Sequence, residues 1–325
     1  MLKVVKTDTY AIMFDQSTGE EIMSGINGHE DPFSLRYPSL MDIGIMGHCQ
    51  NDCYFCYQGE KQEPNMKLDD FKKIIDQSGE VNQIALGGRG DPNKHENFEE
   101  IIDYAVVNGI IPNYTTSGID LTDTEVEVSK MCGAVAVSDY GRDFTYDALN
   151  KFIDAGIKTN IHQVLSKYTF EKSSKILLNV DVWEGKFDRN KLNAIIFLLF
   201  KPQGRGKNLN DHVLDKQQIK DFRYLTKTAT DLPFKIGMDS CMVNMIKQVD
   251  SLSSEERIYM DTCEGARMST YISPNMLLMP CSFGCRDDWG VDINETPIRE
   301  AWNSELFELF RSKLSQKDDV CPFGF

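Results

Sequence analysis

The 325-residue sequence has no long apolar run, no tract of like charge and no Pro/Gly/Ser-rich segment. Its longest apolar run, AIIFLLF at 194–200, is far shorter than the roughly 18 residues that a membrane-spanning helix needs. The first residues, MLKVVKTDTYAIMFD, lack the continuous apolar stretch of a signal peptide. These absences argue against a membrane span and a disordered chain, and they predict a cytoplasmic globular protein.

Positive charge is the second shortage. The chain has 35 Lys and Arg residues against 50 Asp and Glu residues, which gives a formal net charge of −15. This sign repels the phosphates of nucleic acids, and only the short segment KPQGRGK at 201–207 concentrates basic residues. We therefore expect no nucleic-acid partner and a substrate of basic or neutral character.

Between residues 39 and 200, short apolar runs alternate with amphipathic segments. In LDDFKKIIDQSG, for example, Leu68, Phe71, Ile74 and Ile75 recur at helical spacing. The alternation predicts right-handed βαβ units and an α/β fold, a partial (β/α)6 barrel over 39–235 whose site lies at the C-terminal ends of the strands. The expected strands are SLMDIGI (39–45), NQIALGG (82–88), IPNYTTSG (111–118), AVAVSD (134–139), TNIHQVL (159–165) and AIIFLLF (194–200).

Both ends of the chain depart from this rhythm. Residues 1–38 predict a β extension, in which YAIMFDQSTGEEIMSG reads as strand, turn and strand. Residues 236–325 predict a small second domain, with a hairpin turn at Pro274-Asn275. It ends in a helix over TPIREAWNSELFELFRSKL, with Thr296 as its cap and Pro297 at its first position. The apolar face of that helix is Leu306, Phe307, Phe310 and Leu314. Two further helices are expected over 97–109, capped by Asn97 and ended by Gly109, and over 144–156, ended by Gly156.

Nine cysteines are an odd number, and disulfides are rare in a reducing compartment, so clustered cysteines indicate metal ligation. Three lie in the loop GHCQNDCYFCYQG, at positions 49, 53 and 56. Five more lie at 241, 263, 281, 285 and 321, whereas Cys132 stands alone and is expected to be a small buried side chain. The distribution predicts two separate metal sites.

The three-cysteine loop follows the first predicted strand, at the edge of the sheet where active sites of this architecture lie. A [4Fe–4S] cluster normally takes four thiolates, so three from one loop leave one iron open. Cys49-x3-Cys53-x2-Cys56, with Phe55 before the last cysteine, resembles the signature of the radical S-adenosylmethionine (SAM) superfamily. The resemblance implies that the open iron binds SAM and that SAM is cleaved to a 5′-deoxyadenosyl radical, which abstracts hydrogen from the substrate. The competing interpretation is a zinc knuckle completed by His48 or a distant ligand.

Residues at other strand ends extend the resemblance. ALGGRGDPNKHENF resembles the GGE-type motif that holds the amino group of SAM, although Arg89-Gly90-Asp91 stands where Gly-Glu is usual. Ser117 and Ser138, which end two strands, would contact the ribose or carboxylate of SAM, and the alternative is that they cap a helix or turn. His162 or Gln163 would reach the adenine, and the alternative is that His162 is an ordinary core histidine. Arg205 either holds a carboxylate or is simply solvated, and we expect the latter. The cofactor-binding residues implied by the resemblance are Phe55, Gly87, Gly88, Asp91, Ser117, Ser138 and His162.

The second set of cysteines resembles the SPASM/twitch extension. Its hallmark C-x9-15-G-x4-C matches the segment from Cys263 to Cys281, with Met276 at the glycine position. Because five cysteines cannot ligate two complete clusters, the resemblance implies one auxiliary [4Fe–4S] cluster. Its expected ligands are Cys241, Cys263, Cys281 and Cys321, with Cys285 as the rival for the fourth place. A structural zinc ion in the same cysteines is the alternative.

Together these features predict a radical SAM oxidoreductase, a maturase that oxidises a side chain of a peptide or protein by crosslinking, thioether formation or dehydrogenation. The resemblance also implies an electron donor such as flavodoxin or ferredoxin. One alternative is a radical SAM dehydrogenase of a small alcohol or sugar, and another is a non-catalytic zinc or Fe–S binding protein. No catalytic acid or base can be assigned; Asp239 and Tyr140 are candidates only because they are expected near the barrel mouth.

Overall fold

A curved parallel sheet forms the centre of the molecule. The computed structural model describes residues 2–6, 10–26, 35–59, 62–249, 263–283, 287–316 and 321. Within these ranges strands β4 to β10 lie in chain order, each parallel to its neighbour. The six predicted strands are confirmed as β4 to β9, and β10 adds one that the sequence did not indicate. The strands are β4 (Leu40–Ile43), β5 (Gln83–Leu86), β6 (Ile111–Thr116), β7 (Ala134–Ser138), β8 (Thr159–Leu165), β9 (Ala194–Leu199) and β10 (Lys235–Met238).

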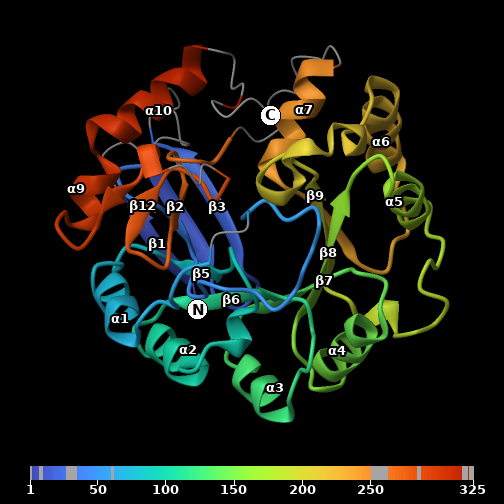
Figure 1. The fold of residues 1–325 in the computed structure, drawn as a ribbon, viewed down its shortest axis with the longest axis horizontal. Helices are drawn as coiled ribbons and strands as arrows, with labels where there is room; N and C mark the ends of the chain where they lie inside the picture. Colours follow the sequence, from blue (N-terminus) through green and yellow to red (C-terminus); the bar gives the residue numbers. More distant parts are fainter. Residues whose placement is uncertain are drawn as a thin grey trace.

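Helices cover the outer side of this sheet (Figure 1). Phe71, Ile74 and Ile75 are buried on one face of α1, as the amphipathic pattern predicts. Gly109 and Gly156 follow α2 and α4 with φ values of 74° and 73°, a left-handed conformation that glycine adopts without strain. The helices between the strands are α1 (Leu68–Asp76), α2 (Phe98–Val107), α3 (Asp123–Ser129), α4 (Asp143–Asp154), α5 (Phe170–Leu177) and α6 (Lys216–Thr228), and α7 (Ser240–Val249) follows β10. Short 3-10 helices are η1 (Pro92–Lys94), η2 (Arg189–Lys191), η3 (Gly204–Asn208), η4 (Asn210–His212) and η5 (Asp287–Trp289).

The C-terminal segment continues the same sheet. β11 (Ser269–Ile272) is parallel to β4, and β12 (Leu277–Met279) and β13 (Val291–Asp292) follow as antiparallel strands. Strand β10 begins at Lys235, so the predicted boundary between 235 and 236 falls inside a strand. Main-chain hydrogen bonds therefore join the predicted barrel and the predicted C-terminal domain, whose separation stays a prediction.

The hairpin between β11 and β12 is confirmed, and its turn has an unusual residue. Met276 has a φ value of 62°, in the left-handed region that favours glycine. Its N–H donates to the carbonyl oxygen of Ser273 at 3.0 Å, and the next N–H, of Leu277, donates to Ser273 Oγ at 3.2 Å. Methionine thus adopts here the backbone conformation that a glycine at this position would supply.

Two predictions about helix ends are wrong. The expected C-terminal helix is divided into α9 (Ile298–Trp302) and α10 (Glu305–Gln316), because Asn303 and Ser304, which favour helix ends, interrupt it. Pro297, not Thr296, occupies the N-cap position of α9, whose first N–H donates to Gln77 Oε1 at 3.0 Å. Asn97 does occupy the N-cap position of α2, but its side chain makes no capping hydrogen bond. The apolar face of α10 is buried at Phe307, Phe310 and Leu314 and half-buried at Leu306.

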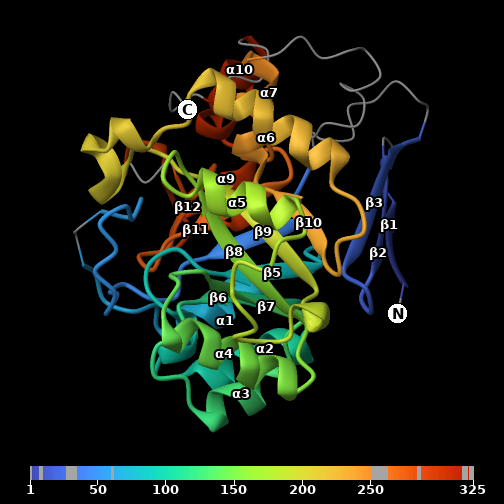
Figure 2. The same cartoon turned by 90° about the vertical axis from the view of Figure 1, so that its right-hand side faces the viewer.

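The first strands form a separate antiparallel sheet of β1 (Leu2–Lys6), β2 (Tyr10–Asp15) and β3 (Glu20–Gly25), which confirms the predicted strand, turn and strand. Figure 2 shows it on the opposite side of the molecule from the loop that follows β4. Asn82 Nδ2 donates to Glu21 Oε2 at 2.8 Å, and Lys158 Nζ donates to the main-chain oxygens of the β2–β3 turn at 3.3 and 3.4 Å. These contacts attach the small sheet to the N-terminal ends of the parallel strands. In the described ranges, no helix combines the length and apolarity that crossing a membrane requires.

Candidate functional site

The three-cysteine loop lies between the end of β4 and the start of α1. Its base is closed by hydrogen bonds from Glu63 N to Gly47 O at 2.8 Å and from Met66 N to Ile45 O at 2.8 Å. A side chain at Gly47 would meet Glu63 O at 2.1 Å, so the two ends of the loop lie so close together that only glycine fits at this position. The base therefore holds the cysteines at the C-terminal edge of the sheet, where the sequence predicts them.

All three thiols of this loop are half-buried. Asn51 N donates to Cys49 Sγ at 3.3 Å, and the Tyr140 hydroxyl lies 3.3 Å from Cys53 Sγ. Burial raises the pKa of the Cys49 and Cys53 thiols, and the neighbouring cysteines add to this effect. Tyr140, which sequence reasoning named only as a general candidate, is thus a direct neighbour of the thiols.

The segment after β9 packs directly on the loop. Arg205 N donates to Cys56 O at 2.8 Å, and a side chain on Gly204, whose φ value is 54°, would meet Tyr57 O at 2.3 Å. The Arg205 guanidinium forms an ion pair with Asp52 and donates to a main-chain oxygen of the loop, with its side chain only 17 % exposed. The expectation of a solvated arginine is therefore wrong, because the guanidinium braces the cysteine loop.

The glycine-rich segment after β5 forms the other wall. Arg89 donates to the main-chain oxygens of Gln58 and Gly59 at 2.7 and 3.2 Å, and Gly90, with a φ value of 68°, lies against His48 O. Gly88 has a φ value of 88° and lies against the Tyr271 hydroxyl of β11, whereas open space surrounds Gly87. A recess of about 410 Å³ lies beside Cys49, between the loop and the two arginines. The contacts of Arg89 were not predicted from the sequence, and for Arg205 only the rejected alternative, a bound carboxylate, pointed to such a contact.

Two of the predicted site residues contact each other. Asp91 accepts hydrogen bonds from Ser117 N, at 2.7 Å, and from Ser117 Oγ. Burial raises the pKa of Asp91, and these hydrogen bonds oppose that effect. These hydrogen bonds join the segment after β5 to the end of β6, so Asp91 fixes the position of Ser117 at the C-terminal edge of the sheet.

The other predicted residues line the barrel or flank the thiols. Ser138 of β7 is paired with His162 of β8, and Thr115 Oγ1 lies 3.4 Å from His162 Nδ1. Burial lowers the pKa of His162 to about 4, so its ring is neutral at pH 7. The Phe55 ring lies 6.5 Å from the ring of Tyr140, whose hydroxyl contacts Cys53 Sγ. Gln163, the alternative to His162, is buried at 2 % exposure in the layer on the other side of β8. Cys132 packs against the hydrophobic core.

The second set of cysteines also gathers in space. Cys263 and Cys281 precede β11 and follow β12, where Ala266 N donates to Pro280 O at 3.0 Å. Burial raises the pKa of both the Cys241 and Cys263 thiols to about 12 and that of Cys281 well above its usual range, and the charges of the other cysteines add to each shift. Cys321 is one of these neighbours, while Cys285 lies outside the described residues. The expected ligand set is thus placed together, and its role stays a prediction.

Within the described ranges, no group of three or more His, Cys, Asp or Glu side chains is arranged to hold a single metal ion. Thiol groups are the donors that iron–sulfur clusters use, and a cluster of several irons is larger than one ion. The donor chemistry of both cysteine sets suits a cluster, and neither set has the close convergence of a single-ion site.

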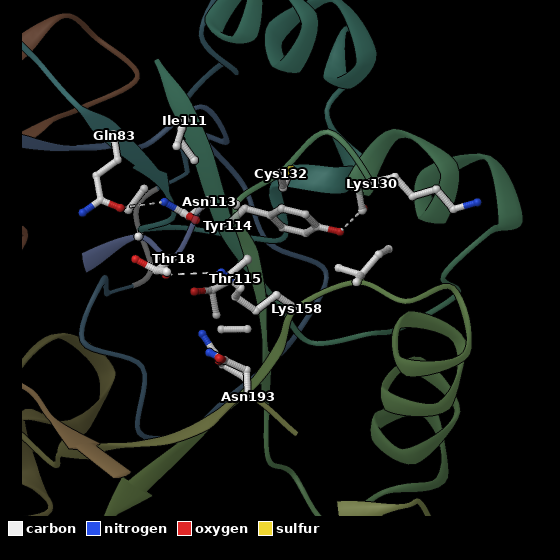
Figure 3. A pocket seen from close by; sticks show the side chains of 18 of the residues that line it. Thr18, Gln83, Ile111, Asn113, Tyr114, Thr115, Lys130, Cys132, Lys158 and Asn193 are labelled. Atoms are coloured by element: carbon white, nitrogen blue, oxygen red, sulfur yellow. Dashed lines mark hydrogen bonds between the residues drawn. The ribbon is translucent and has the colours of Figure 1, made fainter. Parts of the chain in front are cut away.

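A cavity of about 740 Å³ lies at the other end of the barrel, beside the β2–β3 turn. Gln83 and Asn113 point toward each other in it (Figure 3), with Asn113 Nδ2 donating to Gln83 Oε1 at 3.2 Å. Asn193 Nδ2 donates to Asn160 Oδ1 at 2.7 Å, and His162 also lines the cavity. None of the three loop cysteines lines this cavity, so it is separate from the recess beside Cys49.

Known protein structures share the fold. SuiB from Streptococcus suis bound to SAM superposes with a TM-score of 0.72 at 14 % identity, over 96 % of this chain and 89 % of that one. SuiB bound to its precursor peptide SuiA gives 0.71 over 96 % of this chain and 91 % of that one, also at 14 % identity. The enzyme anSMEcpe with bound SAM and the Cp18Cys peptide gives 0.61 at 15 % identity, over 84 % and 82 % of the two chains. These neighbours are radical SAM enzymes, so the predicted fold is confirmed.

Comparison of amino-acid sequences finds a match over less than half of the chain. No family model matches the chain. The tungsten-containing aldehyde ferredoxin oxidoreductase cofactor-modifying protein of Pyrococcus furiosus is 25 % identical over 140 residues. That alignment covers 42 % of this chain and 37 % of the relative.

Proposed function

We propose that the chain is a radical SAM enzyme that oxidises a side chain of a peptide or protein. The placement of Cys49, Cys53 and Cys56 carries the proposal. They share one loop directly after the first parallel strand, and the segments that follow β5 and β9 both contact this loop. The likeness of the fold to radical SAM enzymes supports the same conclusion.

The first site suits a [4Fe–4S] cluster with one open iron. Cys49, Cys53 and Cys56 would ligate three irons, and the recess beside Cys49 offers room for a ligand of the fourth. The Tyr140 hydroxyl beside Cys53 would donate to the bound thiolate, and the Arg205 guanidinium would hold the loop in place. Hydrogen bonds to the thiolates and restricted solvent exposure are the means by which a protein tunes such a cluster.

When bound, this cluster supplies the electron that cleaves SAM to a 5′-deoxyadenosyl radical, the electron coming from a donor such as flavodoxin or ferredoxin. The chain's own residues would position SAM. Open space at Gly87 lets the main chain approach the amino group of SAM, and Asp91 holds Ser117 at the end of β6. The neutral His162 and the adjacent Ser138 offer hydrogen bonds without a charge.

The second set of cysteines would hold one closed auxiliary cluster, with Cys241, Cys263, Cys281 and Cys321 as ligands and Cys285 as the alternative to Cys241. A substrate that gives a hydrogen atom to the radical, then an electron to this site and a proton to solvent, loses two hydrogens in total. The net reaction is thus an oxidation, such as a crosslink, a thioether or a dehydrogenation. Cluster potentials span roughly −700 to +450 mV, so a second cluster can act as the acceptor.

A peptide is the substrate class with the best support. SuiB is described with its precursor peptide SuiA, and anSMEcpe with the Cp18Cys peptide. We expect that co-expression with a short peptide encoded beside this protein lowers the peptide mass by two hydrogens, and that Cys53→Ala abolishes the change. An unaltered peptide in the presence of 5′-deoxyadenosine formation would instead favour a small-molecule substrate.

A further inference from the structure

A buried lysine lies between the two cysteine sites. Lys201 lies two residues after the end of β9, is only 3 % exposed, and its Nζ lies 2.7 Å from Asp239 Oδ2. Asp239 also accepts hydrogen bonds from Leu199 N at 3.2 Å and from Met242 N at 2.9 Å. The carboxylate is thus held by main-chain donors from two elements, and it fixes the ammonium group inside the protein.

The ammonium group faces the second set of cysteines. Lys201 Nζ lies 3.7 Å from the centre of the Phe283 ring, and Phe283 N donates to Cys281 Sγ at 3.3 Å. Burial alone would lower the pKa of Lys201, but the charges of Asp239, Cys241 and Cys281 outweigh burial and raise it. The ammonium group is thus the charged end of the ion pair that lies against Phe283, the residue whose N–H donates to Cys281 Sγ.

The same contacts reach the first cysteine loop. The Phe283 ring lies 4.4 Å from the ring of Tyr57, the residue that follows Cys56. Phe283 thus contacts the second cysteine set through its main chain, and Lys201 and the first loop through its ring. This arrangement places the lysine at the junction of the two sites.

We propose that Lys201 sets the reduction potential of a cluster held by the second cysteine set and makes that cluster a better electron acceptor. The proposal rests on the proposed function, because it requires the auxiliary cluster. Thiolate ligands give a cluster negative charge, and reduction adds another negative charge, so a fixed cation nearby stabilises the reduced form. The buried position strengthens the effect, because little water lies between the charges to screen them.

The test isolates the second site in the full-length chain. In a background with Cys49→Ala, Cys53→Ala and Cys56→Ala, the anaerobically reconstituted protein is titrated with dithionite, and its reduced cluster is measured by electron paramagnetic resonance. The comparison is made at the potential at which half of the cluster in the background protein is reduced. At this potential, Lys201→Met is expected to lower the ratio of reduced to oxidised cluster at least tenfold. Tenfold corresponds to about 59 mV for one electron. Lys201→Arg should retain most of the ratio, since it keeps the charge.

Asp239→Asn supplies the opposite perturbation and a second variant if Lys201→Met does not fold. It keeps an oxygen acceptor but removes the negative charge, so the ratio should rise. Lys172→Met is the matched control, because Lys172 pairs with the buried Asp139 at 2.6 Å at the end of β7, and its loss should leave the ratio unchanged.

Three outcomes would overturn the proposal. One is an unchanged ratio in Lys201→Met at equal iron content, and another is a shift of Lys201→Met and Asp239→Asn in the same direction, which indicates only structural damage. The third is a background protein that binds no iron, which removes the auxiliary cluster. Cleavage of SAM by the chain with all nine cysteines is measured separately, so it decides the radical SAM assignment independently.

Discussion

Replacing Asp42 with asparagine should stabilise the protein, and more so at high pH. Asp42 lies in β4 between Met41 and Ile43, which are fully buried against the helices, so its side chain points into the barrel. Among the described residues it has no hydrogen-bond or ion-pair partner. Burial raises the pKa of Asp42 to about 7, and the charge of Glu264 adds to this. The ionised form is therefore disfavoured in the folded protein.

The sign and size of the effect follow from linkage. The unfolded chain has an ordinary pKa near 3.9, so unfolding releases the proton that the folded protein keeps, and stability falls as pH rises from about 4 to about 7. The difference between the two pKa values corresponds to about 4 kcal/mol at pH 8 and about 1.5 kcal/mol at pH 5. Because Asp42 is only partly buried, we expect about 2 to 4 kcal/mol at pH 8. Asn mimics the protonated carboxyl, so Asp42→Asn should recover this free energy.

The assay is urea unfolding of the metal-free protein, followed by circular dichroism at pH 5 and pH 8. Asp103→Asn is the matched control, since Asp103 is exposed on α2 and the change in net charge is the same. Its effect should be small at both values. An equal effect of Asp42→Asn at the two pH values, or a loss of stability at pH 8, would show that the ionised carboxylate is stabilised in the fold and would refute the reasoning.

Three further substitutions probe the site and the core. Gly87→Ala adds a side chain in open space, so stability and iron content should stay unchanged while SAM binding weakens about tenfold. Gly79→Ala is the control, because a side chain at Gly79 also meets no atom within 4 Å. Unchanged SAM binding in Gly87→Ala would mean that SAM binds elsewhere. Gly204→Ala places a methyl group 2.3 Å from Tyr57 O, so it should shift the cysteine loop and lower iron retention, and full retention would contradict the described packing. Phe71→Ala removes a fully buried ring of α1 and should cost about 3–5 kcal/mol in urea unfolding, whereas a cost below about 1 kcal/mol would contradict its place in the core.

Local patterns predicted much of the fold. The strands β4 to β9 and the buried face of α1 follow from apolar residues at periods of 2 and 3.6, which depend only on neighbours in sequence. The parallel pairing of β11 with β4 and the extra strand β10 depend on contacts between distant segments, and the short segment KIGM gives little pattern. The break between α9 and α10 was missed because the apolar residues on both sides keep helical spacing.

The candidate site divides in the same way. Three cysteines within eight residues are a local signal, so their loop and its position after β4 were predictable. Three contacts of the site join segments that are far apart in the chain, so no residue spacing in the sequence predicts them. They are the contacts of Arg89 and of Arg205 with the cysteine loop and the ion pair of Lys201 with Asp239. Whether Cys241 or Cys285 completes the second set also depends on tertiary structure, and Cys285 lies outside the described residues.

The most direct test of the central claim is SAM cleavage by the anaerobically reconstituted protein. With SAM and dithionite, the protein should form 5′-deoxyadenosine, measured by chromatography and mass spectrometry. Cys53→Ala should form none, because the first site loses a ligand, whereas Cys132→Ala should match the unaltered protein, because Cys132 packs against the core. Absence of 5′-deoxyadenosine from protein loaded with about eight irons per chain, enough for both clusters, or equal formation by Cys53→Ala, would contradict the assignment.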